Sequence, residues 1–144
     1  MREKTLNLLG LMRRANAIAV GETNTGAAVK AGKAKLVLVA SDASDNARHR
    51  AENFIAGRNT IKIDLPFTKA ELSNGLGLPG CSMAAVTDVG FSNALVKLLN
   101  ELSGGMYQTE GEELQKRCMK AERRKAESKA HERNKRIGKR RTKA

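Results

Sequence analysis

The fold of this chain is decided near its centre by the stretch Leu36-Val37-Leu38-Val39-Ala40. Five consecutive aliphatic residues of this kind are typical of a strand that is buried on both faces of a sheet. The polar stretch Ser41-Asp42-Ala43-Ser44-Asp45 follows directly and offers several N-cap residues, so we expect a helix from Asp45 to about Ala56. A buried strand that leads into a helix indicates an α/β protein.

The alternation of strands and helices continues on both sides of this stretch. Apolar residues at three- and four-residue steps predict an amphipathic helix from Glu3 to Ala15. We expect the other strands near residues 18–20, 60–63 and 83–86, and the other helices near residues 23–31, 68–76 and 91–102. The predicted fold class is therefore α/β, a three-layer α/β/α sandwich around a mixed sheet of about four strands.

Polar residues mark the beginnings of two of these helices. Thr23, Asn24 or Thr25 is expected to cap the second helix, because side-chain oxygens of this kind accept hydrogen bonds from the first helical N–H groups. Thr68 is followed three residues later by Glu71, which fits a capping box.

Charge divides the chain into two regions. The 144 residues include 27 lysines and arginines against 15 aspartates and glutamates, a net charge of +12. Residues 1–110 hold 13 basic and 10 acidic side chains, whereas residues 111–144 hold 14 basic and 5 acidic ones. We therefore expect one folded domain, residues 1–105, and a basic tail, residues 106–144, that is disordered or conditionally helical. The excess of positive charge predicts attraction to a polyanion such as nucleic acid.

The tail beyond Gly111 has few large apolar residues, so we do not expect it to form a packed element. A run of charged residues is often only a solvated surface, but this excess of one sign favours contacts with phosphate groups. The predicted phosphate contacts are Arg123, Arg124, Lys125, Lys139, Arg140 and Arg141. With one Tyr, three Phe and no Trp, the chain has few stacking platforms for single strands, which favours structured RNA.

We find no set of residues that predicts catalysis, a metal site or a cofactor. Cys81 and Cys118 are the only cysteines and lie far apart, which fits neither a zinc site nor a disulfide framework. His49 and His131 have no catalytic motif around them. No stretch approaches the roughly 20 apolar residues of a membrane span. We therefore expect a soluble, cytoplasmic, monomeric protein that is not an enzyme.

Two other features resemble sites but are better interpreted as local structure. Residues 75–80 read Gly-Leu-Gly-Leu-Pro-Gly and match a dinucleotide-binding motif, yet they are expected after a helix and before a strand, the reverse of the required order. Asp42, Asp45 and Asp88 each lie where a strand meets a helix, so we expect them to be N-caps and not acid or base groups.

Three segments together resemble a known family. They are Gly21-Glu22 before a helix, Lys33-Ala34-Lys35-Leu36-Val37-Leu38-Val39-Ala40-Ser41-Asp42-Ala43-Ser44, and Ala85-Val86-Thr87-Asp88-Val89-Gly90-Phe91-Ser92. In order, spacing and expected secondary structure they resemble the kink-turn RNA-binding ribosomal protein superfamily, in its bacterial YlxQ-type branch. The resemblance covers about residues 4–103.

This resemblance implies a non-enzymatic protein that grips a sharply bent internal loop of a structured RNA, such as ribosomal RNA, in or near the ribosome. The grip is formed by the turn and N-terminus of the second helix and by the loop before the last strand. The matching positions of the first element are Gly21, Glu22, Thr23 and Asn24, with Lys30 and Lys33 at its basic end. Those on or beside the second are Leu72, Leu76, Gly77, Leu78 and Pro79.

The chain departs from the family pattern at several positions. The usual Asn-Glu pair reads Thr23-Asn24, the lysine three residues later is Ala27, and the glycine after Leu72 is Ser73. Two alternatives follow: an interaction module for an acidic protein partner that keeps only the fold, or a recognition subunit that acts with a separate RNA-modifying enzyme. Gly21 can also be only a turn residue, and Leu76 and Leu78 only the edge of the core.

Overall fold

Helices and strands alternate along the chain as the sequence predicts. The structure is a computed structural model that describes residues 2–77 and 81–142, with the side chains of the last helix described to residue 132. The helices are α1 (Arg2–Arg14), α2 (Glu22–Lys30), α3 (Asp45–Ile55), α4 (Lys69–Leu76), α5 (Val89–Ser103) and α6 (Gln108–Thr142). The strands are β1 (Ile18–Val20), β2 (Leu36–Val39), β3 (Ile61–Asp64) and β4 (Met83–Val86).

The four strands form one mixed sheet with the order β1-β4-β2-β3. Strand β2 runs parallel to β3 and antiparallel to β4, and β4 is also antiparallel to β1. Every residue of β2 and β4 is buried, because these strands occupy the centre of the sheet and have a helical layer on each face. The predicted double burial of the Leu36 strand is confirmed.

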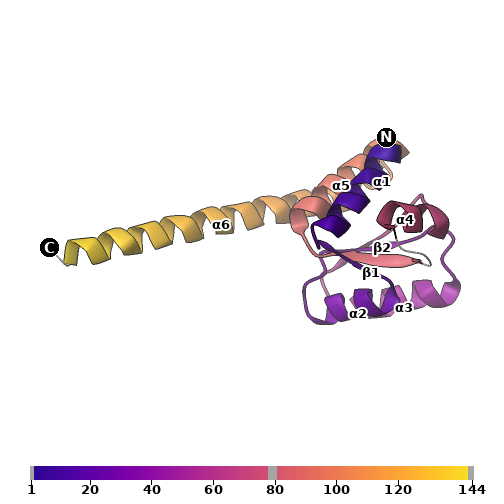
Figure 1. The fold of residues 1–144 in the computed structure, drawn as a ribbon, viewed down its shortest axis with the longest axis horizontal. Helices are drawn as coiled ribbons and strands as arrows, with labels where there is room; N and C mark the ends of the chain where they lie inside the picture. Colours follow the sequence, from indigo (N-terminus) through magenta and orange to yellow (C-terminus); the bar gives the residue numbers. More distant parts are fainter. Residues whose placement is uncertain (1, 78–80, 143–144) are drawn as a thin grey trace.

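Successive residues of β2 face opposite layers, as the strand period of two requires. Leu36 and Leu38 pack in one core cluster with residues of α1, α4 and α5. Val37 and Val39 pack in a second cluster with α2 and α3. Figure 1 shows α1, α4 and α5 on one side of the sheet and α2 and α3 on the other. The fold is the expected three-layer α/β/α sandwich.

The caps of α4 and α5 agree with the sequence. Thr68 and Glu71 form the predicted capping box of α4, with both reciprocal hydrogen bonds present. At α5 the Asp88 side chain accepts a hydrogen bond from the Phe91 N–H at 3.0 Å. Asp88 is therefore a structural N-cap, and its carboxylate is engaged in holding the helix end.

The other two predicted aspartate caps are placed differently. Ser44 is the N-cap of α3, and Asp45 is the first residue of that helix. The Asp42 carboxylate accepts a hydrogen bond from the Lys69 backbone N–H at 2.7 Å, so it stabilises the beginning of α4 and not that of α3. The prediction was wrong here because Asp42 finds its donor 27 positions along the chain, beyond what a local motif reveals.

The first turns of the basic tail belong to the packed domain. Tyr107 and Leu114 are buried in the same core cluster as the α1 and α5 side chains. The Tyr107 hydroxyl donates a hydrogen bond to the Asp64 carbonyl oxygen at 2.5 Å, which joins this segment to the end of β3. The expectation that the chain beyond Gly111 forms no packed element is therefore wrong for these turns, since one buried leucine beside α5 anchors them.

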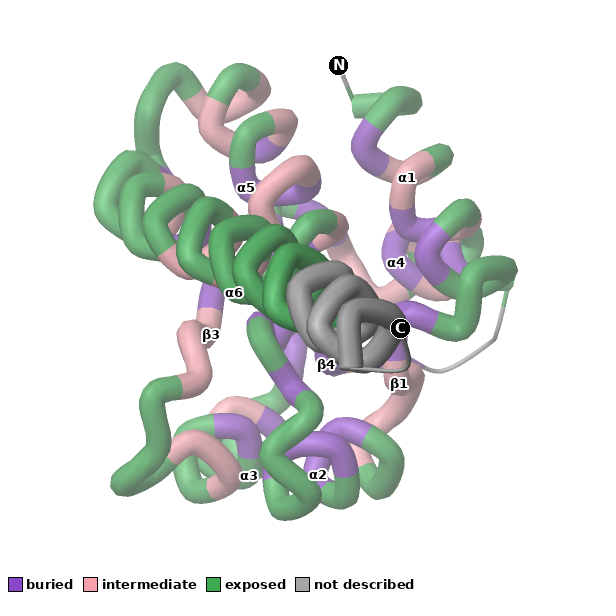
Figure 2. Tube along the Cα trace, turned by 90° about the vertical axis from the view of Figure 1, so that its left-hand side faces the viewer, coloured by how far each residue is buried: buried purple, intermediate pink, exposed green. Residues whose placement is uncertain are grey.

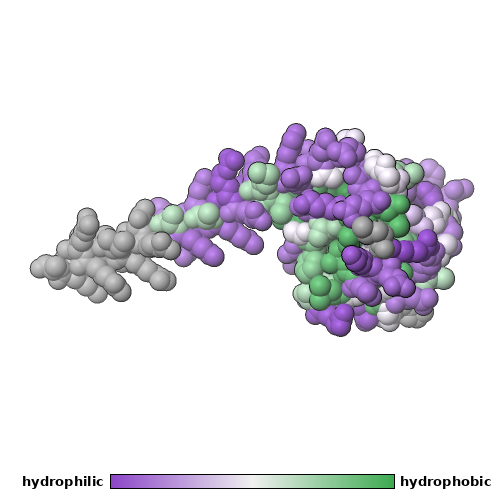
Figure 3. Space-filling model, turned by 90° about the horizontal axis from the view of Figure 1, so that it is seen from above, coloured by the Kyte–Doolittle hydropathy of each residue, from purple (hydrophilic) through white to green (hydrophobic). Residues whose placement is uncertain are grey.

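Beyond its first turns, α6 leaves the domain. Figure 1 shows the helix projecting away from the sandwich, and Figure 2 shows it exposed over most of its described length. Residues 122–132 are all exposed, and Figure 3 shows hydrophilic side chains covering most of the visible surface of this described stretch. A helix that is polar on every side is stabilised by its own side-chain pairs or by a partner, not by core packing.

Within residues 2–77 and 81–142, no helix is both long and apolar enough to cross a membrane. The same part of the chain contains no group of three or more His, Cys, Asp or Glu residues arranged to hold a metal ion.

Candidate nucleic-acid interface

The turn between β1 and α2 is built around Gly21. Its φ of 93° lies in the left-handed region that favours glycine. The Gly21 N–H donates a hydrogen bond to the Met83 carbonyl oxygen at 3.1 Å, at the beginning of β4. This bond places the turn before α2 next to the end of the α4–β4 loop, so the two segments meet at one end of the sheet.

The N-terminus of α2 has no side-chain cap. The predicted caps are wrong: the Thr25 hydroxyl donates to the Gly21 carbonyl oxygen at 2.7 Å, and the Asn24 amide donates to the Val20 carbonyl oxygen at 2.9 Å. Both side chains bond backward to carbonyl groups, and Gly21 takes the N-cap position. The N–H groups of the first turn, which carry partial positive charge, therefore lack an internal side-chain acceptor and form a suitable place for a phosphate.

The outer face of α2 continues from this terminus. Thr23, Asn24 and Ala27 are exposed, whereas Thr25 and Ala28 are buried against the rest of the domain. Positions three and four residues apart lie on the same side of a helix, so the three exposed residues form one surface. This surface presents a hydroxyl and an amide next to the open helix end.

Glu22 opens α2 and forms an ion pair with Arg50 of α3. The pair balances the only acidic charge at the start of α2, where a free carboxylate would repel phosphate. The Arg50 side chain is 63% exposed, so its guanidinium remains available at the surface beside the helix end.

The α4–β4 loop begins at Gly77, which ends α4 with a φ of 73°. The Ser73 hydroxyl accepts a hydrogen bond from the Cys81 N–H at 3.1 Å and thereby ties the far end of the loop to α4. Cys81 is buried, and this burial raises the pKa of its thiol, so the thiol stays protonated at neutral pH. Gly77 and Cys81, the described residues on either side of positions 78–80, are therefore both hydrogen-bonded to Ser73 of α4.

A basic hollow adjoins Gly77 on the α1 side. It has a volume of about 490 Å³ and is lined by Gly10, Arg13, Arg14, Asn74, Gly75, Leu76 and Gly77. The Arg13 guanidinium donates to the Leu76 carbonyl oxygen at 2.9 Å and so binds the C-terminus of α4. Arg13 and Arg14 are exposed and add two positive charges to this side of the interface.

Comparison with known proteins gives the family. The profile of the ribosomal protein L7Ae/L30e/S12e/Gadd45 family matches residues 3–96. The chain belongs to this family.

Two relatives specify its YlxQ-type branch. The RNA-binding protein YlxQ of Enterococcus faecium is 33% identical over 98 residues, which are 68% of this chain and 93% of the relative. The RNA-binding protein YlxQ of Bacillus subtilis (strain 168) is 35% identical over 97 residues, 65% of this chain and 92% of the relative. This chain therefore has additional sequence that these relatives lack, and the family match ends before α6 begins.

Solved structures agree with the fold. A protein of unknown function from Bacillus halodurans C has a TM-score of 0.62 and 28% identity, and covers 67% of this chain and 97% of its own. The Giardia lamblia 15.5kD RNA binding protein has a TM-score of 0.53 and 19% identity, and covers 69% of this chain and 84% of its own. At that identity the second likeness shows the fold alone.

The structure brings together only part of the set of residues that the family resemblance suggested. Gly21, Glu22, Thr23 and Asn24 lie together at the start of α2, and Gly77 begins the loop that leads to Met83, the residue bonded to Gly21. Leu78 and Pro79 fall outside the described residues.

Two other members of the predicted set are core residues. Leu72 and Leu76 are 0% and 2% exposed and pack in the cluster under α1 and α5. The prediction that their side chains contact RNA is corrected on this ground, because they support α4 from beneath and do not reach its surface. The alternative interpretation of Leu76 as part of the core is the right one.

The two lysines of the predicted set lie away from the open end of α2. Lys30 is the last residue of this helix, and Lys33 lies in the connection to β2. A nine-residue helix is about 13 Å long, so Lys30 is separated from Gly21 by the length of α2. The two lysines therefore belong to the opposite end of the domain.

The predicted phosphate contacts of the tail lie on α6. Arg123, Arg124 and Lys125 are exposed, past the turns that pack on the domain. The side chains of Lys139, Arg140 and Arg141 fall outside the described residues. Sequence reasoning missed Arg13, Arg14 and Arg50 as members of the interface; the Arg13-Arg14 pair at a helix end was a signal, but it was explained by the helix dipole alone.

Proposed function

We propose that this protein binds a structured RNA with a kinked internal loop, through the surface formed by the start of α2 and the α4–β4 loop. The observation that carries the proposal is the hydrogen bond from the Gly21 N–H to the Met83 carbonyl oxygen. It joins the two segments that the family resemblance implies as one RNA grip. Two YlxQ relatives that are named RNA-binding proteins support the same conclusion.

Each part of this surface has a distinct task in the proposed complex. The open N-terminus of α2 accepts a phosphate at the bend. Thr23 and Asn24 reach exposed base edges, which a kinked loop presents and a regular duplex does not. Arg13 and Arg14 neutralise phosphate charges of the RNA backbone where it passes beside Gly77. The protein holds its RNA without reacting with it, in the cytoplasm and in association with ribosomal RNA or the ribosome.

The basic helix α6 adds affinity in this proposal, while the domain supplies selectivity. Contacts between cations and phosphates strengthen binding to any RNA and carry no sequence information. The exposed cluster Arg123-Arg124-Lys125 is suited to such contacts.

The test compares binding of the full chain to a kinked internal-loop RNA and to a straight duplex of equal length and charge, at near-physiological salt. We expect the kinked RNA to bind at least tenfold more tightly, about 1.4 kcal/mol. The double variant Thr23→Ala/Asn24→Ala should lose most of this preference. Asn53→Ala, at an exposed position of α3, is the matched control and should retain it.

Equal affinity of the unmodified chain for the two RNAs would contradict the proposal. Because Ala27 and Ser73 depart from the family pattern, that result would favour the alternative in which the fold serves contact with an acidic protein partner.

A further inference from the structure

A second basic groove lies at the other end of the domain, between α6 and the sandwich. Its volume is about 590 Å³, and it is lined by Val29, Gly32, Ala34, Lys35, Gly57, Arg58, Asn59, Thr60, Val89, Arg117, Lys120, Ala121 and Arg124. Five of these residues are lysines or arginines, and none is acidic. Val29 lies in the last turn of α2, and Gly32 and Ala34 follow this helix, so most of α2 separates the groove from the Gly21 turn.

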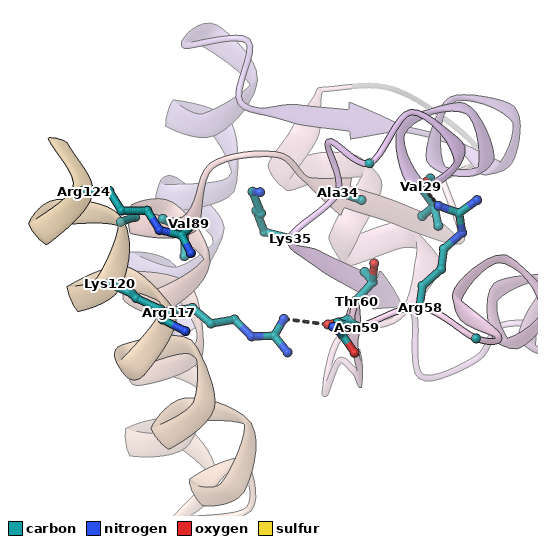
Figure 4. Close-up of a pocket in the computed structure, with 13 residues that line it drawn as sticks. Val29, Ala34, Lys35, Arg58, Asn59, Thr60, Val89, Arg117, Lys120 and Arg124 are labelled. Atoms are coloured by element: carbon teal, nitrogen blue, oxygen red, sulfur yellow. Dashed lines mark hydrogen bonds between the residues drawn. The ribbon is translucent and has the colours of Figure 1, made fainter. Parts of the chain in front are cut away.

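One face of α6 forms a wall of this groove. Arg117, Lys120 and Arg124 recur at three- and four-residue steps, which places them on the same side of the helix. Figure 4 shows their side chains pointing from α6 toward the domain. The Arg117 guanidinium donates a hydrogen bond to the Asn59 carbonyl oxygen at 2.6 Å, so this wall is fixed against the segment before β3.

Internal contacts account for two of the five cations. Arg58 donates to the Val29 carbonyl oxygen at 3.0 Å and satisfies the C-terminus of α2. Arg117 pairs with Glu113 on its own helix in addition to its bond to Asn59. Both arginines therefore have a structural role that needs no ligand.

The other three cations have no such role. Lys35, Lys120 and Arg124 are exposed, and within the described part of the chain none of them forms an ion pair with a carboxylate. The positive charges around this hollow repel one another. An anion bound in the hollow would offset this repulsion. Lys30, the last residue of α2, and Lys33, in the connection to β2, are also exposed and are close in sequence to Gly32 and Ala34 of the groove lining.

We propose that this groove binds the sugar-phosphate backbone of RNA and is a second contact site, independent of the kinked loop. The proposal rests on the proposed function only in taking RNA as the ligand. Trp, Tyr and Arg typically anchor the centres of protein interfaces, and of these three the groove lining has only arginine and no aromatic residue. Cations repeated along one helix face are instead suited to the repeated phosphates of a nucleic acid strand.

The groove is a property of this chain and not of the matched family region. Arg117, Lys120 and Arg124 supply one wall, and all three lie beyond residue 96, where the family match ends. Sequence added after the family domain has therefore combined with Lys35 of the domain to form the site.

The test uses the full chain and a straight RNA duplex, which has no kinked loop for the first surface. The groove variant is Lys35→Gln/Lys120→Gln/Arg124→Gln. The control variant, Lys4→Gln/Lys97→Gln/Lys116→Gln, removes the same charge from exposed positions outside the groove lining. Thermal melting of both variants checks that the fold is retained.

We expect the groove variant to bind the duplex at least tenfold more weakly and to lose about 2–3 from the slope of log K against log salt, since each phosphate contact contributes about 0.9. The control should weaken binding less than threefold. Equal losses in the two variants would overturn the proposal, because the net positive charge of the chain, and not the groove, would then explain the affinity.

Binding of poly-glutamate separates an acidic protein from RNA as the ligand. If the groove variant loses poly-glutamate binding but keeps duplex binding, the groove is a protein site and the proposal is wrong. The ratio of affinities for kinked and straight RNA distinguishes the two surfaces: failure of the kinked-loop proposal removes this ratio without changing the effect of the groove variant.

Discussion

Ala27 occupies the exposed side of α2, between the open helix end and Lys30. The family resemblance implies a lysine at this position. Because Thr23 and Asn24 lie one turn earlier on the same face, a lysine here would extend along the proposed path of the RNA backbone. Its absence removes one phosphate contact without changing the shape of the site.

The substitution Ala27→Lys should therefore increase affinity for kinked RNA. An exposed ion pair contributes at most about 1 kcal/mol, so we expect a gain of roughly two- to fivefold at low salt. The slope of log K against log salt should steepen by about 0.9. Fluorescence anisotropy at several salt concentrations measures both quantities. Asn53→Lys adds the same charge on α3; an equal gain there would show that net charge, and not position 27, is responsible.

For single residues, the sequence predicts contacts whose two partners lie close together along the chain. The Thr68 capping box was predictable because both of its partners lie within four residues. Asp42 was not, because its donor, the Lys69 N–H, lies 27 positions away. Leu72 shows a third limit: a leucine beside a functional loop has the same sequence signature whether it faces a ligand or the core, and only the packing decides.

Among the helices and strands, β2 is the easiest to predict from the sequence, and the packing of the start of α6 is the hardest. Five aliphatic residues in a row are typical of a strand at the centre of a layered sheet, and β2 is buried throughout as this pattern predicts. The start of α6 has the composition of a solvated helix with a single buried leucine, Leu114. Its packing depends on the space that α5 and the sheet leave beside it, which no pattern within α6 reveals.

Leu114 should therefore contribute to the stability of the whole domain. Leu114→Ala removes a fully buried side chain from the main core cluster, and changes of this kind cost about 2–5 kcal/mol. We expect a clear decrease in Tm and in the urea midpoint. Met119→Ala on the same helix is the control, because Met119 is 59% exposed, and it should change stability by less than about 0.5 kcal/mol. An unchanged Tm for Leu114→Ala would mean that α6 does not pack on the domain in solution.

For the molecule as a whole, the two proposals divide affinity and selectivity between the projecting helix and the domain. The surface proposed to recognise the kinked loop lies near Gly21, and the basic groove lies at the other end of α2. The helix then carries positive charge away from the sandwich (Figure 1). Because Leu114 and Arg117 hold its first turns, a truncation that tests the projecting part must begin beyond them.

Removal of residues 126–144 meets this condition and eliminates eight basic and two acidic side chains. The buried turns and the groove remain, so Tm should stay within a few degrees of that of the full chain. Binding to all RNAs should weaken together, and the salt slope should fall by about 0.9 for each lost phosphate contact. The preference for kinked over straight RNA should persist, because the Gly21 surface is intact. An unchanged salt slope would mean that the projecting helix contacts no phosphates, and a lost preference would mean that it takes part in recognising the bend.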